Sequence, residues 1–230
     1  MTKSTKILTR TILLVSFISL LTDIASEMLY PVMPVYLRSI GFSVLMIGIL
    51  EGLAEATAGL SKGYFGNLSD VRRKRAGFVQ AGYALSAISK PMMAMFLFPV
   101  WIFFARTLDR LGKGIRTGAR DAVLSDEATP ENKGRVFGFH RGMDTLGAAV
   151  GPALALVYLW FWPGQYRWLF VIAFLPGLMA ILLSSLLKDK PAFQEESPEK
   201  MEVPEKTAKV GFLSYFKYWK VADPVYRKLI

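Results

Sequence analysis

Long apolar runs separated by short connectors that carry charge make up most of this chain. Each run is long enough to cross a hydrocarbon core of about 30 Å as a helix, which takes about 20 residues. Because such runs recur and the connectors are short, the pattern favours a bundle of membrane helices over one large soluble domain. It predicts an all-α membrane protein with six transmembrane helices, at Thr11–Leu37, Val44–Phe65, Gly77–Phe98, Val100–Asp121, Gly134–Phe161 and Tyr166–Leu187.

Basic residues lie mainly at the ends of these spans and alternate between the two sides. The formal net charge is +10, but the connectors on one side carry only Arg38 and Arg167. Lys and Arg accumulate on the cytoplasmic side of a membrane protein. The distribution therefore predicts a multi-pass protein of the cell membrane with a cytoplasmic N-terminus, and it argues against nucleic acid as a partner.

The fourth span departs from the pattern because it starts apolar and then fills with charge. On a helix of about 100° per residue, all of its ionisable side chains fall on one stripe. These residues are Arg106, Asp109, Arg110, Lys113, Arg116, Arg120 and Asp121. Charge at membrane depth is costly unless it faces a bundle interior or a watery cavity. We therefore expect this helix to line a polar passage.

Ionisable residues also occur within the other spans. They are Asp23 and Glu27 in the first, Glu51 and Glu55 in the second, Lys90 in the third and Asp144 in the fifth. An unpaired charge is least tolerable near mid-depth, so we expect the acidic groups to face the fourth span, with Asp23, Glu27 or Glu55 near Arg106 or Arg110. The alternative is that these charges are structural pairs that bridge neighbouring helices.

The composition changes after the sixth span. Residues 189–209 are rich in Pro, Glu and Lys and are typical of a solvated linker, whereas residues 211–218 are aromatic and basic enough to lie on a membrane surface. We therefore divide the chain into a six-helix unit, 1–190, and a cytoplasmic linker with an interfacial segment, 191–230.

Several kinds of chemistry find no support in the sequence. Cysteine is absent, which excludes disulfides and zinc–thiolate sites. We see neither a metal-binding cluster nor a nucleophile elbow, so a membrane-embedded hydrolase is disfavoured. We expect no cofactor, no bound metal and no enzymatic activity.

Three motifs resemble signatures of the major facilitator superfamily. The connector after the second span has a glycine, three further residues, an aspartate and a basic run, as in the family's loop between helices two and three. The residues concerned are Gly66, Asp70, Arg72, Lys74 and Arg75, while Val71 and Arg73 depart from the usual pattern. In the family this loop locks against the other half of the transporter when the cytoplasmic side closes.

The other two motifs lie in the fourth and fifth spans. Arg110, Lys113 and Gly114 resemble the family's fourth-helix pattern, and the longer run from Asp109 to Arg116 is similar to a little-characterised prokaryotic group with the motif DRxGKGxR. The close-packing sequence with Gly147, Gly151 and Pro152 resembles the fifth-helix signature of the family's exporters, although the later glycine pair is missing.

This resemblance implies a fold and a function. The fold would be two inverted three-helix repeats, which together form one half of a major facilitator transporter. The function would be secondary active transport of a small solute, proton-coupled and outward, by alternating access. Its partners would be membrane lipid, the solute, protons and the C-terminal half of the same transporter, to which residues 191–230 would lead. A non-transporting scaffold or sensor on the same fold is the alternative, and a homodimer of six-helix units is the alternative to a missing half.

Overall fold

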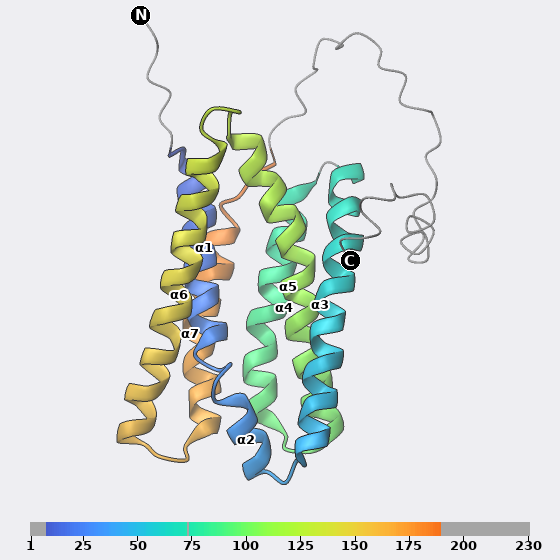
Figure 1. Cartoon of the computed structure of the whole chain (residues 1–230), viewed down its shortest axis with the longest axis vertical. Helices are drawn as coiled ribbons and strands as arrows, with labels where there is room; N and C mark the ends of the chain where they lie inside the picture. Colours follow the sequence, from blue (N-terminus) through green and yellow to red (C-terminus); the bar gives the residue numbers. More distant parts are fainter. Residues whose placement is uncertain (1–7, 73, 190–230) are drawn as a thin grey trace, which may run out of the picture. The chain divides into compact units, whose positions relative to one another are not determined.

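The computed structural model of this protein describes residues 8–72 and 74–189, which form a helical bundle without a β-strand in these two ranges (Figure 1). The helices are α1 (Arg10–Glu27), α2 (Met33–Ser39), α3 (Val44–Arg72), α4 (Arg75–Met95), α5 (Pro99–Glu127), α6 (Lys133–Phe161) and α7 (Tyr166–Ser184). The predicted linker and interfacial segment, 191–230, lies outside the described residues.

The first predicted span is interrupted, so the prediction of one helix over Thr11–Leu37 was wrong. α1 ends at Glu27, a stretch of turns follows, and α2 begins at Met33. Pro31 and Pro34 account for the break, because proline lacks the backbone N–H that a helix interior requires. Pro34 lies in the first turn of α2, where a helix tolerates proline.

The helix ends follow local chemistry. The side chain of Thr9 caps α1 by accepting a hydrogen bond of 3.2 Å from the backbone N–H of Ile12. Pro99 occupies the first turn of α5. α3 continues to Arg72 and α5 to Glu127, beyond the apolar runs that defined the predicted spans. Both helices therefore extend past the apolar segment with polar turns.

Two groups of three long helices make up the bundle. α1 packs against α6 and α7, whereas α5 packs against α3 and α4, and contacts between α4 and α7 join the groups. Figure 1 shows α1, α6 and α7 on one side and α3, α4 and α5 on the other. α1 and α5 are therefore the helices that pack against both other members of their own group.

The outer surface of the bundle is apolar. Leucines of several helices are more than half exposed, among them Leu60 of α3, Leu156 of α6 and Leu182 of α7. Such a surface is typical of contact with lipid. Among the described helices α3, α6 and α7 are long and apolar enough to cross a membrane, while the charges of α1, α4 and α5 lower their hydropathy.

Tryptophan side chains mark one end of the bundle. Trp101 lies in the first turn of α5, Trp160 and Trp162 lie at the end of α6, and Trp168 lies in the first turn of α7. All but Trp101 are more than half exposed. The alternation of helix direction brings these positions to the same end (Figure 1). Tryptophan is enriched where a membrane meets water, so this end is a candidate for one of the two interfaces.

Glycines of the fifth-span motif lie where α6 meets α1. A Cβ added to Gly147 would come within 2.8 Å of the Leu20 carbonyl oxygen, and one added to Gly151 would come within 2.7 Å of the Met28 nitrogen. Such distances are shorter than van der Waals contact between these atoms. Two of the three motif residues, Gly147 and Gly151, thus permit close packing of these two helices; the third, Pro152, lies within α6.

Replacing Gly151 by alanine is expected to destabilise the bundle by about 1–3 kcal/mol, the usual cost of forcing an extra methyl into a packed contact. Thermal unfolding in detergent would measure the change. Gly142→Ala is the matched control, because it lies on the same helix with nothing within 4 Å of the added Cβ. If both variants melted alike, the close contact would not be important for stability.

Candidate functional site: the charged stripe of α5

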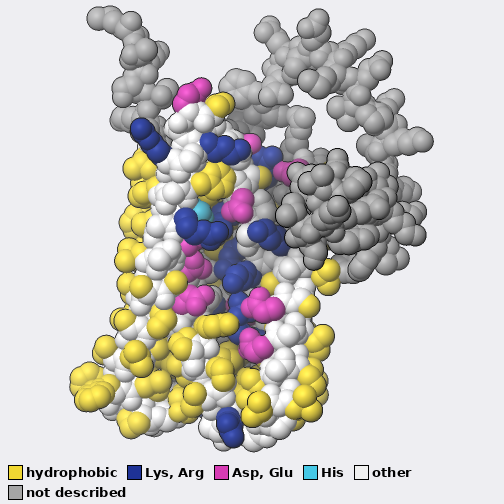
Figure 2. Space-filling model, in the orientation of Figure 1, with side chains coloured by type: hydrophobic (Ala, Val, Ile, Leu, Met, Phe, Trp, Pro, Cys, Tyr) yellow, Lys and Arg dark blue, Asp and Glu magenta, His cyan; other side chains and the backbone are white. Residues whose placement is uncertain are grey.

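We call the charged residues along one side of α5 the α5 stripe. Its members are Arg106, Asp109, Arg110, Lys113, Arg116 and Arg120. In Figure 2 Lys and Arg side chains form a band down the middle of one face, with Asp and Glu side chains on both sides of it. All members except Lys113 are buried. Burial of so many charges is tolerable only when they are paired or hydrogen-bonded.

Glycines bring α5 close to the helices that supply these partners. A Cβ on Gly112 would lie 2.6 Å from the Gly82 carbonyl oxygen of α4, and one on Gly114 would lie 2.7 Å from the Ala58 carbonyl oxygen of α3. The fourth-span glycines therefore allow α3 and α4 to approach α5 so closely that short polar side chains on them reach the stripe.

Arg106 forms the best aligned ion pair of the stripe, with Glu51 of α3. Its Nε donates to Glu51 Oε1 at 2.9 Å and its Nη2 donates to Oε2 at 2.7 Å. The Arg106 side chain is only 4% exposed, whereas that of Glu51 is 26% exposed. Two parallel hydrogen bonds fix the guanidinium plane, so Glu51 holds Arg106 in one orientation.

Arg110 faces Glu55, one turn further along α3, in a looser arrangement. Arg110 Nε lies 3.1 Å from Glu55 Oε1 but has no aligned hydrogen bond to any described residue. The guanidinium also lies over the Tyr30 ring, at 5.6 Å from its centroid. Because the Glu55 side chain is half exposed, this pair is open to solvent and to a solute in a way that Arg106–Glu51 is not.

Lys90 of α4 pairs with Asp109 of the stripe, and both residues are buried. The Lys90 ammonium is 3.5 Å from Asp109 Oδ1 and donates to the Ser86 carbonyl oxygen at 2.8 Å. Arg106 Nη1 lies 3.5 Å from Asp109 Oδ2. The Asp109 carboxylate is thus shared by two cations. The sequence indicated that Lys90 needs a carboxylate, and this is the group that supplies it.

Arg116 is buried without a carboxylate partner among the described residues. Its Nη1 donates to Ser86 Oγ at 2.9 Å, and Ser86 Oγ donates in turn to Asp109 Oδ1 at 2.8 Å. The guanidinium lies over the Tyr83 ring at 4.9 Å, a cation–π contact. Arg116 is therefore held by α4 through neutral groups, and its positive charge is not neutralised directly.

Arg120 connects α5 with α1 and α6. It donates to Ser19 Oγ at 2.8 Å and lies 3.7 Å from Asp144 Oδ2. His140, one turn before Asp144 on α6, is also buried, with its Nε2 at 3.5 Å from Asp144 Oδ1 and its Nδ1 at 3.3 Å from Ser16 Oγ. This cluster links the two helix groups through polar contacts.

Asp23, Glu27 and Lys113 are not brought into ion pairs within the described part of the chain. Both carboxylates belong to α1, and neither pairs with Arg106 or Arg110, so of the three acidic residues predicted to lie near those arginines only Glu55 does. The rotation of α1 in the bundle, which the sequence does not specify, decides this.

The predicted loop signature lies at the end of α3, where it contacts α5. Arg75 Nη2 lies 3.0 Å from Asp70 Oδ1, and its Nη1 donates to the Ala122 carbonyl oxygen at 3.3 Å and also pairs with Asp126. Gly66 lies next to Gly118, while Arg72 and Lys74 are exposed. Arg75 thus joins the connector to the last turns of α5.

Sequence reasoning missed three hydroxyl-bearing members of the site. Ser86 and Tyr83 of α4 and Tyr30 after α1 contact arginines of the stripe. The three hydroxyl-bearing residues are common in helices and give no signal of their own. Their spacing relative to Lys90 is the one available hint, since Ser86 and Tyr83 lie on the same side of α4, four and seven residues before it.

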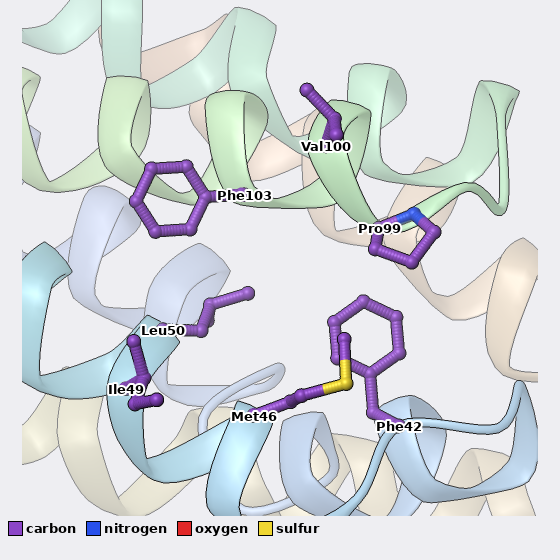
Figure 3. Close-up of a pocket in the computed structure, with 7 residues that line it drawn as sticks. All are labelled: Phe42, Met46, Ile49, Leu50, Pro99, Val100 and Phe103. Carbon is purple, nitrogen blue, oxygen red and sulfur yellow. The ribbon is translucent and has the colours of Figure 1, made fainter.

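No metal site accompanies the stripe in the described residues. No group of three or more His, Asp or Glu side chains there is arranged to hold a metal ion. One apolar pocket of about 260 Å³ lies between the start of α5 and the start of α3 (Figure 3). It is lined by Phe42, Met46, Ile49, Leu50, Pro99, Val100 and Phe103. Because none of these is ionisable, the pocket adds no proton or ion chemistry.

Relatives of this chain include a protein named as an MFS-type transporter. The chain is 34% identical over 185 residues to an uncharacterized MFS-type transporter of Methanocaldococcus jannaschii, a match that covers 80% of this chain and 46% of that protein. It is also 30% identical over 159 residues to a multidrug resistance protein B homolog of Mycobacterium tuberculosis, covering 65% of this chain and 27% of that protein. The chain therefore spans less than half the length of these relatives.

A solved structure shares the fold. The chain aligns with a bacterial homolog of the human lysosomal transporter Spinster, in an inward-facing and unoccupied conformation, with a TM-score of 0.62 and 18% identity, over 92% of this chain and 48% of that one. The family model of the Major Facilitator Superfamily matches residues 15–224. The relative from Methanocaldococcus jannaschii and the human counterpart of the solved structure are both named as transporters. The chain belongs to the major facilitator superfamily.

Proposed function

We propose that this chain is one half of a secondary active transporter that moves a small solute across the cell membrane by alternating access. The observation that carries the proposal is the α5 stripe, a row of mostly buried charges, most of them paired, inside a bundle whose outer surface is apolar. Ionisable groups at membrane depth mark solute or ion pathways. In the looser pair, Arg110 with Glu55, a charged solute or a proton can take the place of one partner.

The packing supports two inverted three-helix repeats. If α1, α3 and α4 correspond to α5, α6 and α7, then the contact of α1 with α6 corresponds to that of α5 with α3. The contact of α1 with α7 likewise corresponds to that of α5 with α4, and the contact of α4 with α7 corresponds to itself. All five major contacts of the bundle fit this exchange, which is the relation expected of repeats inverted in the membrane.

A second six-helix unit completes the transporter in this proposal. If the bundle were alone in the membrane, the exposed members of its charged face, such as Lys113 and Glu55, would contact lipid. Lipid cannot solvate these charges. The C-terminal half of the same transporter would cover that face, with residues 191–230 as the connection; a second copy of the chain is the competing account. Both termini of the unit would lie in the cytoplasm, as the charge distribution predicts.

Proton coupling and export belong to the same proposal. Two α-helical carboxylates, Glu55 and Asp23, are the candidates for proton carriage. Neither is tied by an aligned pair of hydrogen bonds, unlike Glu51. We propose the outward direction of transport because one relative is a multidrug resistance protein B homolog. The packing motif in α6, which resembles an exporter signature, supports the same direction.

Reconstitution tests the proposal directly. Residues 1–230 and the longer protein that includes a second half would each be placed in vesicles, and the mass of the assembly and the pH-driven movement of a metabolite mixture measured. Movement by the completed transporter is the expected result. Movement by a stable dimer of residues 1–230 would favour the homodimer. Solute binding without movement in any form would reject transport and favour a scaffold or sensor.

A further inference from the structure

The α5 stripe contains more positive charge than its partners neutralise. Five cations of α4 and α5 lie along it, not counting Arg120, which belongs to the cluster with Asp144. They are Lys90, Arg106, Arg110, Lys113 and Arg116. Three carboxylates, Glu51, Glu55 and Asp109, pair with three of these cations. Lys113 and Arg116 are left without a carboxylate within 4 Å in the described residues, so two of the five positive charges remain in excess.

The matching negative charge lies on α1. Asp23 and Glu27 are one turn apart and form no ion pair within the described residues. Their side of α1 is turned toward α5. Ser19, one turn before Asp23, accepts a hydrogen bond of 2.8 Å from Arg120, and the Tyr30 ring, three residues after Glu27, lies 5.6 Å from the Arg110 guanidinium. Two carboxylates of α1 thus lie on the side that faces the α5 stripe, without an ion pair to it in the described residues.

Contacts with α4 keep Arg116 from forming an ion pair with Asp23 or Glu27. Its guanidinium lies between the Ser86 hydroxyl, at 2.9 Å, and the Tyr83 ring, at 4.9 Å. Both groups belong to α4. Arg116 is 4% exposed, so its charge is desolvated, and no carboxylate of the described residues forms an ion pair with it. A buried guanidinium of this kind favours binding of an anionic group.

From this arrangement, and on the basis of the proposed transport function, we propose that the solute is a small zwitterion. Its ammonium group binds Asp23 and Glu27 of α1, and its acidic group, a carboxylate or a phosphate, binds Lys113 and Arg116 of α5. A pure anion would meet the two carboxylates of α1, and a pure cation would meet the two free cations of α5. Only a solute with both charges neutralises both sides.

Proton coupling fits this assignment. When Asp23 binds a proton it loses its charge and its attraction for the ammonium group, so a proton and the solute compete for the same carboxylate. Release of one would accompany binding of the other, which is the relation that exchange of a solute against protons requires.

The test uses the form of the transporter that moves solute in the reconstitution described above. Vesicles are loaded with an equimolar mixture of four charge classes. These are amino acids and phosphoethanolamine as zwitterions, dicarboxylic acids and sugar phosphates as anions, diamines and choline as cations, and hexoses as neutral solutes. Mass spectrometry then follows the loss of each compound. We expect zwitterions to leave at least about tenfold faster than the other classes, a difference of about 1.4 kcal/mol.

Charge-neutralising variants on the two sides should change selectivity in opposite directions. Glu27→Gln should shift the preference toward anions, and Lys113→Gln toward cations, each by about tenfold. Neither residue is buried, so folding should be unaffected. Lys133→Gln is the matched control, because Lys133 is an exposed lysine in the first turn of α6, and it should keep the selectivity of the parent. Arg116→Gln and Asp23→Asn repeat the test at the buried pair, with thermal unfolding as the check on folding.

The outcomes separate the two proposals. If no compound moves, the proposed transport function fails. If compounds move but zwitterions have no advantage, or if Glu27→Gln and Lys113→Gln leave the selectivity unchanged, transport stands and the zwitterion assignment is overturned. Among zwitterions, preference for phosphoethanolamine or for amino acids tells whether the acidic group is a phosphate or a carboxylate.

Discussion

Replacing Asp109 by asparagine is expected to lower the free energy of unfolding by about 3–5 kcal/mol, the range found when one partner of a buried ion pair is removed. Asp109 is shared by Lys90 and Arg106 and also accepts a hydrogen bond from Ser86. Without the carboxylate, the Lys90 ammonium is left in a fully buried position facing a second cation. Thermal unfolding in detergent would measure the loss.

A second substitution distinguishes this charge effect from damage to packing. In the double variant Asp109→Asn, Lys90→Met the uncompensated ammonium is gone, so much of the lost stability should return. Asp70→Asn is the surface control. Its side chain is 56% exposed and lies 3.0 Å from that of Arg75, which is 25% exposed, and a surface pair contributes about 1 kcal/mol or less. If the double variant were as unstable as Asp109→Asn alone, charge pairing would not be the cause.

Replacing Glu55 by glutamine is expected to reduce proton-driven transport by at least about tenfold, equivalent to about 1.4 kcal/mol, while exchange of solute for solute continues. The Glu55 carboxylate is half exposed and faces Arg110 without an aligned hydrogen bond. If Arg110 changed its partner, the Glu55 carboxylate would therefore be free to bind or release a proton. Glutamine cannot do this. The two modes would be measured in the same vesicles, with and without a pH gradient.

Glu51→Gln is the matched comparison one turn away on α3. Glu51 fixes Arg106 through two hydrogen bonds, so its amide variant should impair exchange and proton-driven transport together. Asp23→Asn tests the second candidate for proton carriage. Unchanged proton-driven transport in both Glu55→Gln and Asp23→Asn would reject the assignment of coupling to these two carboxylates.

The fold was largely predictable because membrane helices have a strong sequence signal. Helix starts at Val44 and Tyr166 coincide with those read from the apolar runs. The failure lies at Pro31 and Pro34, within the predicted span Thr11–Leu37, where the structure has two helices with turns between them. Hydropathy alone does not separate these outcomes, since the residues around both prolines remain apolar.

The site was predictable only in part, for a geometric reason. Periodicity places the charges of α5 on one stripe, but it does not say how far each neighbouring helix is rotated toward it. Glu51 and Glu55 reach Arg106 and Arg110, while Asp23 on α1 does not. Neutral contacts were not predictable at all, because their role depends on packing with another helix.

The four tryptophans at one end of the bundle, Trp101, Trp160, Trp162 and Trp168, have a spectroscopic consequence. Trp219, the fifth of the chain, lies outside the described residues. Within residues 8–72 and 74–189, tryptophan fluorescence, as selected by excitation at long wavelength, therefore originates at that end alone. Brominated acyl chains should quench the exposed Trp160, Trp162 and Trp168 more than Trp101, whose indole Nε1 donates to the Met92 carbonyl oxygen at 2.7 Å. Emission would thus monitor opening or closing at this end without an attached dye.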